Sequence, residues 1–187
     1  FLSADEDYIF QLADKGLTKD RGILYAKGRI VLFAPHGSGI KIDGELHGLR
    51  AALADGRIQR FAIANPDHAP YGRAAKAVLR HAGLWSILKP KLVMGENALQ
   101  AMQFAASGSS QGGIVPLSLS MAAPVAKLGR FALIPVAWHA EEPLRQRMVL
   151  LKGAGDVATA FYKYLQNAAA RQLFIRYGFV LPGDTAQ

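Results

Sequence analysis

The sequence predicts an α/β fold, because short apolar segments with strand character alternate with longer segments whose apolar residues recur at helical spacing. The clearest alternation lies between residues 61 and 108, where a strand, a loop and a helix follow one another twice. With 187 residues and 51% hydrophobic content, the chain is long enough for one ordinary domain or two small lobes. No apolar run is long enough to cross a bilayer.

The segment before this alternation is expected to contain two helices and a strand. Asp5 has the side chain of a helix N-cap, and Gly16 marks the end of the helix that follows it. Residues 29–34 form a strongly apolar run that predicts a strand, bounded by a loop at residues 35–39. A second helix is expected around residues 47–54.

The first repeat of the alternation combines a strand at residues 61–64, a loop with two prolines and a helix. Apolar residues recur at helical spacing after Pro70, and Gly83 supplies the C-terminal stop. Pro70 therefore fits the first helical position, where its missing N–H costs nothing. The N–H groups of Tyr71 and Gly72 are expected to be unpaired there, at the positive end of the helix dipole, where an oxyanion can accept both.

The second repeat has the same order and predicts a second helix start beside the first. Residues 91–94 predict a strand, residues 95–97 a turn in which Asn97 is an N-cap candidate, and a helix runs from Ala98 to the stop at Gly108. In an open α/β sheet, successive helix starts lie at the carboxyl edge of the strands, where ligands bind. The two helix starts therefore form one candidate anion site.

The remainder of the chain is expected to alternate in the same way. Strands are predicted at residues 131–136 and 145–151, followed by two closing helices that Asp156 and Asn167 cap. The loop at residues 107–113 is too short for a domain linker.

Composition and charge exclude several classes of protein. The chain has 22 basic and 14 acidic residues, but the basic residues are scattered, without the dense stripe and stacking aromatics of a nucleic-acid surface. Cysteine is absent, which excludes disulfides and thiolate metal sites. The five histidines lack the paired spacing of a zinc helix, and neither a nucleophile elbow nor a phosphate-loop lysine motif occurs. The sequence therefore predicts no catalytic residue and no enzyme.

Two polar residues of the predicted loops have structural interpretations. His68 follows Asp67 and can form an acid–base pair with it, but a loop histidine that orders its own turn is the better interpretation. Glu96 would repel an anion if its side chain pointed into the site, so we expect it to point outward or to bond to backbone.

Several motifs together resemble the family of periplasmic molybdate-binding proteins of ABC transporters. The most specific is Asn-Pro-Asp-His-Ala-Pro-Tyr-Gly at residues 65–72, and others are Gly-Glu-Asn at 95–97, Gly-Ile-Val at 113–115 and Arg-Tyr-Gly-Phe at 176–179. The similarity covers nearly the whole chain. It implies an extracytoplasmic or periplasmic receptor that closes two lobes on molybdate or tungstate and delivers the anion to a membrane permease of an ABC importer. Neither a cofactor nor membrane insertion is expected.

The resemblance also implies which residues bind the oxyanion. Backbone N–H groups at the positions of Tyr71 and Ala98 bind the anion in the family, and we add Gly72, Asn97 and Pro70 as neighbouring candidates. Many members donate a tyrosine hydroxyl after Gly-Ile-Val, where this chain has Pro116, so that contact is expected to be lost or replaced. No residue is expected to bind the metal atom directly.

The fold that the resemblance implies is the two-lobed type II architecture of periplasmic binding proteins, with two mixed sheets flanked by helices and joined by two crossing hinge strands. Residues 1–33 are then part of lobe one, residues 34–144 form lobe two, and residues 145–187 return to lobe one. Phe1 resembles a position well inside lobe one. The rest of that lobe, with two hydroxyl ligands, is therefore expected upstream of this sequence.

Two other functions remain open at this point. A transcription regulator can use the same two-lobed fold as an effector-sensing domain, with a DNA-binding segment upstream. The fold can also serve as a receptor for another oxyanion, such as sulfate.

Overall fold

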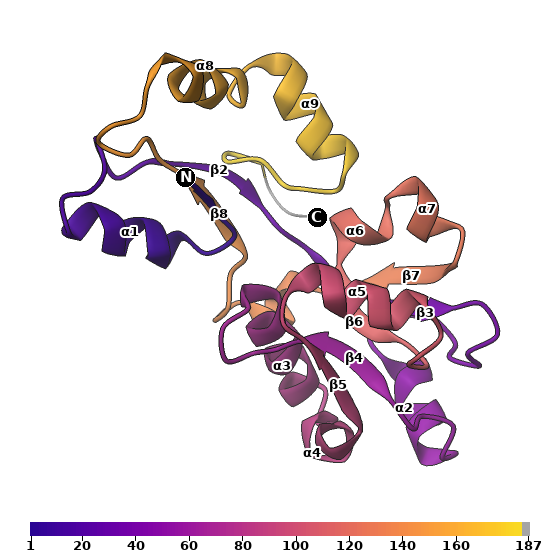
Figure 1. Ribbon diagram of the computed structural model, residues 1–187. Helices are drawn as coiled ribbons and strands as arrows, with labels where there is room; N and C mark the ends of the chain where they lie inside the picture. The colour runs from indigo at the N-terminus through magenta and orange to yellow at the C-terminus, as the bar shows by residue number, and fades with distance from the viewer. Residues whose placement is uncertain (185–187) are drawn as a thin grey trace. The chain divides into compact units, whose positions relative to one another are not determined.

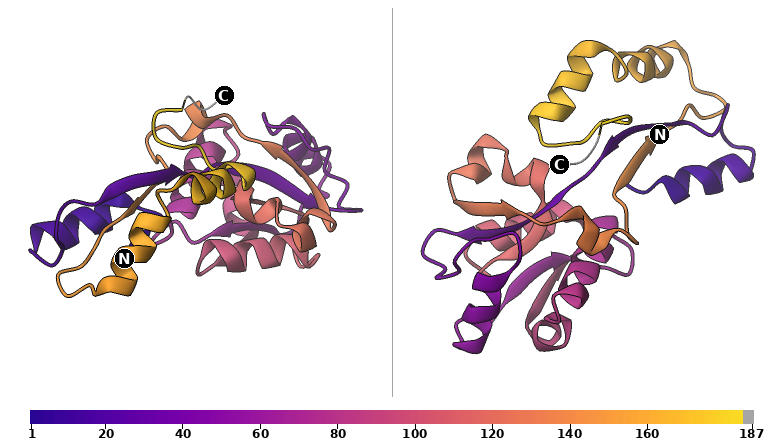
Figure 2. Two further views of the ribbon diagram at one scale, coloured as in Figure 1. Left: turned by 90° about the horizontal axis from the view of Figure 1, so that it is seen from above. Right: turned by 180° about the vertical axis from the view of Figure 1, so that it is seen from behind.

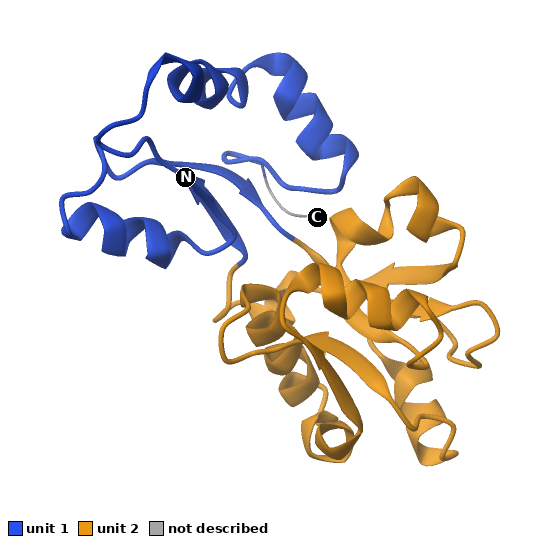
Figure 3. Ribbon diagram, in the orientation of Figure 1, with its two compact units in different colours: residues 1–28, 144–187 blue, residues 29–143 orange. Residues whose placement is uncertain are grey.

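The computed structural model describes residues 1–184, which form two compact units (Figure 3). Unit 1 contains residues 1–28 and the chain from residue 144 onward, and unit 2 contains residues 29–143. The sequence-based division placed the first boundary five residues later, after residue 33. The difference arises because the strand at residues 30–35 is hydrogen-bonded on both sides to strands of unit 2.

Unit 1 contains a three-stranded sheet in the order β1-β8-β2, in which both pairs of strands are antiparallel. Its strands are β1 (Leu2–Ser3), β2 (Ile23–Lys27) and β8 (Arg145–Met148). Its helices are α1 (Glu6–Asp14), α8 (Asp156–Tyr164) and α9 (Ala168–Arg176). The sequence had not predicted β2, which has no fully apolar run because Tyr25 and Lys27 interrupt it.

Unit 2 contains a mixed five-stranded sheet with helices between its strands (Figure 1). Its strands are β3 (Ile30–Pro35), β4 (Phe61–Ala64), β5 (Leu92–Gly95), β6 (Gly113–Pro116) and β7 (Gly129–Leu133). Its α-helices are α2 (His47–Ala54), α3 (Pro70–His81), α4 (Trp85–Leu88), α5 (Ala98–Ala106), α6 (Leu117–Ser120) and α7 (Ala123–Ala126). Two short 3₁₀ helices are η1 (Lys89–Lys91) and η2 (Val136–His139). None of the helices in residues 1–184 is long and apolar enough to span a bilayer.

The pairing of the strands in unit 2 decides where their ends lie. The strand order is β5-β4-β6-β3-β7; β4 runs parallel to β5 and β6, whereas β3 runs antiparallel to β6 and β7. The carboxyl ends of β4, β5 and β6 therefore meet at one edge of the sheet, and β3 ends at the opposite edge.

The core of unit 2 lies on both faces of this sheet. One cluster of buried residues joins Ala62 and Ala64 of β4 to Ala101 and Ala105 of α5. Alternation along the strand directs Phe61 and Ile63, both fully buried, to the other face, against which α3 packs (Figure 1, Figure 2). Because β4 is buried on both faces, all four of its residues are apolar.

Most of the predicted helix ends are confirmed, because their signals are local. Asp5, Asn97 and Asn167 each cap a helix by accepting a hydrogen bond from a backbone N–H two or three residues later. Pro70 is the first residue of α3, as expected. Asp156 is the exception: it is the first helical residue of α8, and Gly155 occupies the N-cap.

Two predicted strands are shorter in the structure than in the sequence analysis. The strand expected at 131–136 is β7, which ends at Leu133, because Pro135 lacks an N–H and is followed by η2. The strand expected at 145–151 is β8, which ends at Met148.

Two glycines allow the helices of unit 2 to approach the sheet closely. A Cβ atom on Gly72 of α3 would lie 2.3 Å from the carbonyl oxygen of Ala64, and one on Gly95 would lie 2.5 Å from the backbone nitrogen of Ala101. Both distances are far below any real Cβ contact, and both neighbouring atoms belong to backbone that cannot rotate away. These two glycines therefore set how near α3 and α5 begin to the ends of their strands.

The substitution Gly72→Ala tests this packing. We expect it to lower the free energy of unfolding by about 1–3 kcal/mol, because the added methyl group must push α3 away from β4. Urea denaturation measures the change. Gly155→Ala is the control, since a Cβ there meets no atom of the described residues within 4 Å and Gly155 has a negative φ; because alanine is a poorer N-cap than glycine, its effect should be a loss below about 1 kcal/mol. Equal stability of the two variants would contradict the packing argument.

Candidate functional site

The two predicted helix starts lie at the same edge of the sheet in unit 2. Ala64, the last residue of β4, is the register partner of Gly95, the last residue of β5. A short loop leads from each strand end to the helix that follows, α3 or α5. The parallel pairing therefore brings the starts of α3 and α5 together, as the sequence analysis predicted.

The start of α3 offers fewer donors than expected. Ala69 occupies the N-cap in an extended conformation, and its carbonyl oxygen accepts hydrogen bonds from the N–H groups of Gly72 (2.9 Å) and Arg73 (3.0 Å). The prediction that the amide of Gly72 is an unpaired donor is therefore wrong, and Pro70 has no N–H to give. Tyr71, the second residue of the helix, is the remaining candidate of this turn, and it is buried.

The start of α5 presents two adjacent amides. The side chain of Asn97 accepts the N–H of Gln100 at 2.9 Å, and the side chain of Gln100 accepts the N–H of Glu96 at 2.6 Å. The N–H groups of Ala98 and Leu99 are the other first-turn donors, and they have no acceptor among the residues that the structure describes. Ala98 was predicted as a ligand; Leu99 was not, although its position two residues after the N-cap indicates the same role.

The loops that precede the two helices are bonded to each other. The N–H of Asn65 donates to the carbonyl oxygen of Gly95 at 2.7 Å, and the ring Nε2 of His68 lies 2.8 Å from the carbonyl oxygen of Glu96. The interpretation that His68 orders its own turn is therefore wrong. Asn65 orders that turn instead, through its side-chain oxygen, which accepts the N–H of Asp67, and its carbonyl oxygen, which accepts the N–H of Ala69.

The electrostatics of this edge favour an anion. Neither α3 nor α5 has an acidic residue in its first turn, so no side chain of that turn compensates the positive end of either helix dipole. The carboxylate of Glu96 is 75% exposed, which agrees with the expectation that it points outward. Tyr71 and Ala98 therefore lie where negative charge is stabilised.

The third strand that ends at this edge, β6, offers no hydrogen-bond donor at its last residue, Pro116. Pro116 ends β6 and is buried, and its carbonyl oxygen accepts the hydroxyl of Ser120 at 3.0 Å. Because proline has no N–H, Pro116 cannot replace the tyrosine hydroxyl that many members of the resembled family place there.

The chemistry of the available groups fits an oxyanion rather than a metal cation. Within residues 1–184, no group of three or more His, Asp or Glu side chains is arranged to hold a metal ion. Backbone N–H groups are donors only, and they recognise oxygen atoms that carry negative charge.

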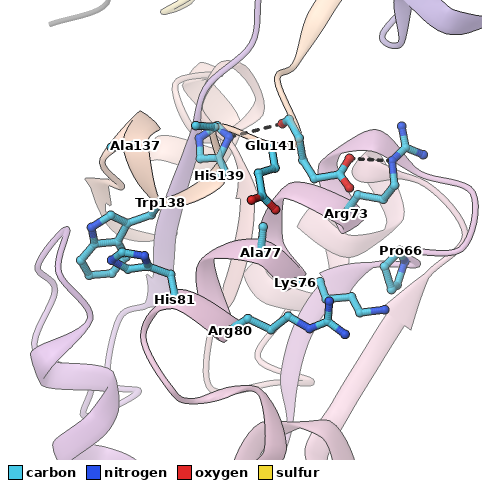
Figure 4. Close-up of a pocket in the computed structure, with 12 residues that line it drawn as sticks. Pro66, Arg73, Lys76, Ala77, Arg80, His81, Ala137, Trp138, His139 and Glu141 are labelled. Carbon is cyan, nitrogen blue, oxygen red and sulfur yellow. Dashed lines mark hydrogen bonds and ion pairs between the residues drawn. The ribbon is translucent and has the colours of Figure 1, made fainter.

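A separate pocket of about 480 Å³ lies beside α3 and η2 in unit 2 (Figure 4). Its lining includes basic residues of α3 as well as Glu141 and Glu142. Arg73 forms an ion pair with Glu142 in which Nε and Oε2 are 3.0 Å apart, and the ring of His81 stacks on Trp138 with centroids 4.6 Å apart. Both signs of charge therefore line this pocket, in contrast to the start of α5, whose first turn has no acidic residue.

His139 is the buried titratable group of this pocket. Only 2% of the residue is exposed, and its Nε2 atom has no hydrogen-bond partner among the described residues. Burial lowers the pKa of His139, and a long hydrogen bond of Nδ1 to the carbonyl oxygen of Glu142 (3.5 Å) opposes that shift only partly. The imidazole is therefore neutral in the folded protein at neutral pH.

This burial predicts a loss of stability in mild acid. Below about pH 6.5 the unfolded chain binds a proton at residue 139 that the folded protein does not, so the free energy of unfolding should decrease as pH falls from 7 to 5. His139→Phe removes this contribution, and its stability should fall less steeply over the same range. Urea denaturation at several pH values measures both slopes; parallel slopes for the variant and the native protein would contradict the prediction.

Comparison with known proteins shows the family of this chain. The profile of the bacterial extracellular solute-binding protein family matches residues 1–180. The molybdate-binding protein ModA of Rhodobacter capsulatus is 32% identical over 183 residues, which are 96% of this chain and 68% of that protein. ModA of Azotobacter vinelandii is 34% identical over 184 residues, which are 97% of this chain and 70% of that protein.

Solved structures show the same architecture. The periplasmic molybdate-binding protein of Azotobacter vinelandii superposes with a TM-score of 0.84 at 29% identity, covering 97% of this chain and 78% of that one. The sulfate-binding protein SubI of Mycobacterium tuberculosis superposes with a TM-score of 0.69 at 15% identity, covering 97% of this chain and 68% of that one, which shows a common fold alone. The expected fold class, that of periplasmic binding proteins, is thereby confirmed, and the chain belongs to the family of bacterial extracellular solute-binding proteins.

Proposed function

We propose that this protein is the periplasmic receptor of an ABC importer and that it binds molybdate or tungstate at the starts of α3 and α5. The observation that carries the proposal is the pair of helix starts at one sheet edge, where Ala98 and Leu99 present N–H groups that no acceptor within residues 1–184 meets. The relatives named molybdate-binding proteins support the choice of anion. In this role the anion is the cargo, a membrane permease is the partner, and no cofactor takes part.

The binding free energy expected from the proposed contacts shows whether they suffice for tight binding. A hydrogen bond to a charged group contributes about 1.5–3 kcal/mol, so the donors at Ala98 and Leu99 contribute about 3–6 kcal/mol before the cost of association. Micromolar binding requires about 8.2 kcal/mol. Tight binding therefore needs further donors. We expect a protein of the relatives' full length to bind molybdate tightly and this chain alone to bind it weakly, because the chain spans only 68–70% of those relatives.

The proposed site discriminates by size rather than by charge. Molybdate, tungstate and sulfate are all tetrahedral dianions at neutral pH, so neutral amides fixed on backbone can separate them only through the distance between donors. Sulfate is the alternative ligand, and calorimetric titration of the complete protein with molybdate and with sulfate decides between them. Equal affinity for the two anions would contradict the choice of molybdate.

The substitution Ala98→Pro deletes one proposed donor without breaking the helix. Ala98 is the first residue of α5, where proline is favoured, and Asn97 already has the extended conformation that a residue before proline adopts. Losing one hydrogen bond to a charged ligand should weaken molybdate binding at least about tenfold. Isothermal titration calorimetry of the complete protein measures the change.

Ala98→Ser is the matched control, because serine keeps the N–H and is well tolerated at a helix start. Its affinity for molybdate should stay close to that of the native protein. If Ala98→Pro binds molybdate as tightly as Ala98→Ser, the amide of Ala98 is not a ligand and the proposed site is wrong.

A further inference from the structure

His68 connects the two loops of the proposed anion site. It lies in the loop between β4 and α3, and its ring Nε2 is 2.8 Å from the carbonyl oxygen of Glu96 in the loop between β5 and α5. A carbonyl oxygen only accepts hydrogen bonds, so Nε2 must carry the proton and donate it. The contact joins residues that are 28 positions apart in the chain, and it lies beyond the last paired residues of the two strands, Ala64 and Gly95.

The acceptor of this bond belongs to the peptide group that leads into α5. The carbonyl of Glu96 and the N–H of Asn97 are parts of one planar trans peptide, so fixing the direction of one fixes the direction of the other. The N–H of Glu96 is held as well, by the side chain of Gln100 at 2.6 Å. His68 and Gln100 together therefore set the backbone orientation immediately before Ala98.

The carboxylate of Glu96 is a second neighbour of the ring, with Oε2 3.4 Å from Nε2. This contact is longer than the one to the carbonyl oxygen, and the carboxylate is 75% exposed. Exposed ion pairs of this kind contribute little, because water screens them and the side chains lose conformational freedom. The bond to the backbone is therefore the one that can hold the two loops together.

We propose that His68 is a positioning residue of the anion site: its hydrogen bond to the Glu96 carbonyl fixes the direction of the amides that begin α5 and their spacing from the start of α3, and thereby the size of oxyanion that the site accepts. This inference rests on the proposed function. His68 does not touch the anion in this role. Its contribution is to hold one loop against the other before the anion arrives, so that the donors need no rearrangement on binding.

The test uses the complete protein with four variants. His68→Leu removes the donor, and His68→Gln keeps an N–H at nearly the same position. Glu96→Gln removes the carboxylate but keeps the carbonyl. His36→Leu is the control, because His36 follows β3, which ends at the opposite edge of the sheet. Calorimetry with molybdate and with sulfate gives affinity and selectivity, and hydrogen exchange of the ligand-free protein reports on the hydrogen-bonded amides of Glu96, Gln100 and Ala101.

His68→Leu should bind molybdate about three- to tenfold more weakly, the loss expected for one net hydrogen bond, and should discriminate less against sulfate. The amides of Glu96, Gln100 and Ala101, which are hydrogen-bonded in the native protein, should exchange about three- to tenfold faster in this variant without ligand. His68→Gln should restore all three properties, and Glu96→Gln and His36→Leu should leave them unchanged. A purely structural role of the histidine would lower stability without changing selectivity.

The outcomes separate this inference from the proposed function. If the native protein binds molybdate and His68→Leu matches it in affinity, selectivity and amide exchange, the inference is wrong and the function stands. Failure of His68→Gln to restore these properties, or a loss in Glu96→Gln equal to that in His68→Leu, also overturns it. If the native protein binds no oxyanion, the proposed function fails, while faster exchange in His68→Leu alone would still show that His68 orders the start of α5.

Discussion

The candidate site follows from one constraint of helix geometry: the first N–H groups of an α-helix have no acceptor inside that helix. In α5 the side chain of Asn97 satisfies one of them, and Ala98 and Leu99 keep theirs. In α3 the carbonyl oxygen of Ala69 accepts the N–H groups of Gly72 and Arg73, and Pro70 has no N–H. Among the described residues, the donors that remain at α5 lie at the positive end of its helix dipole, beside the start of α3, so a compact anion with several oxygen atoms is the partner that satisfies them.

The remaining architecture of unit 2 places these donors side by side. Parallel pairing of β4 with β5 puts both strand ends at one edge, and the absence of Cβ atoms on Gly72 and Gly95 lets both helices begin close to those ends. An open sheet alone does not fix the distance between two helix starts, because each loop can move. The bonds from Asn65 to Gly95 and from His68 to Glu96 reduce that freedom. The distance between the two helix starts thus depends on the strand pairing, on the two glycines and on the hydrogen bonds between the loops.

Helix starts were predicted correctly from local signals, whereas the partners of individual polar groups at those starts were not. Pro70 and Asn97 mark helix starts through signals within a few residues, so both were found. The unpaired state of Gly72 was predicted incorrectly, because a helix start with an extended N-cap lets Ala69 accept its N–H. His68 was assigned to its own turn because its true acceptor, the carbonyl of Glu96, is a backbone atom in another loop, which no local pattern of side chains reveals.

Neutral backbone donors suit a receptor that must both select its anion and release it. A lysine or arginine in the site would attract every anion strongly, and its flexible side chain would adapt to ions of different size. Amides at a helix start stabilise a dianion with partial charges whose positions the fold has already determined, so little reorganisation accompanies binding. Selectivity then depends on how firmly the two helix starts are held apart. In this chain that separation is set by strand pairing, by two glycines and by the hydrogen bond of one histidine, none of which carries the charge that the anion meets.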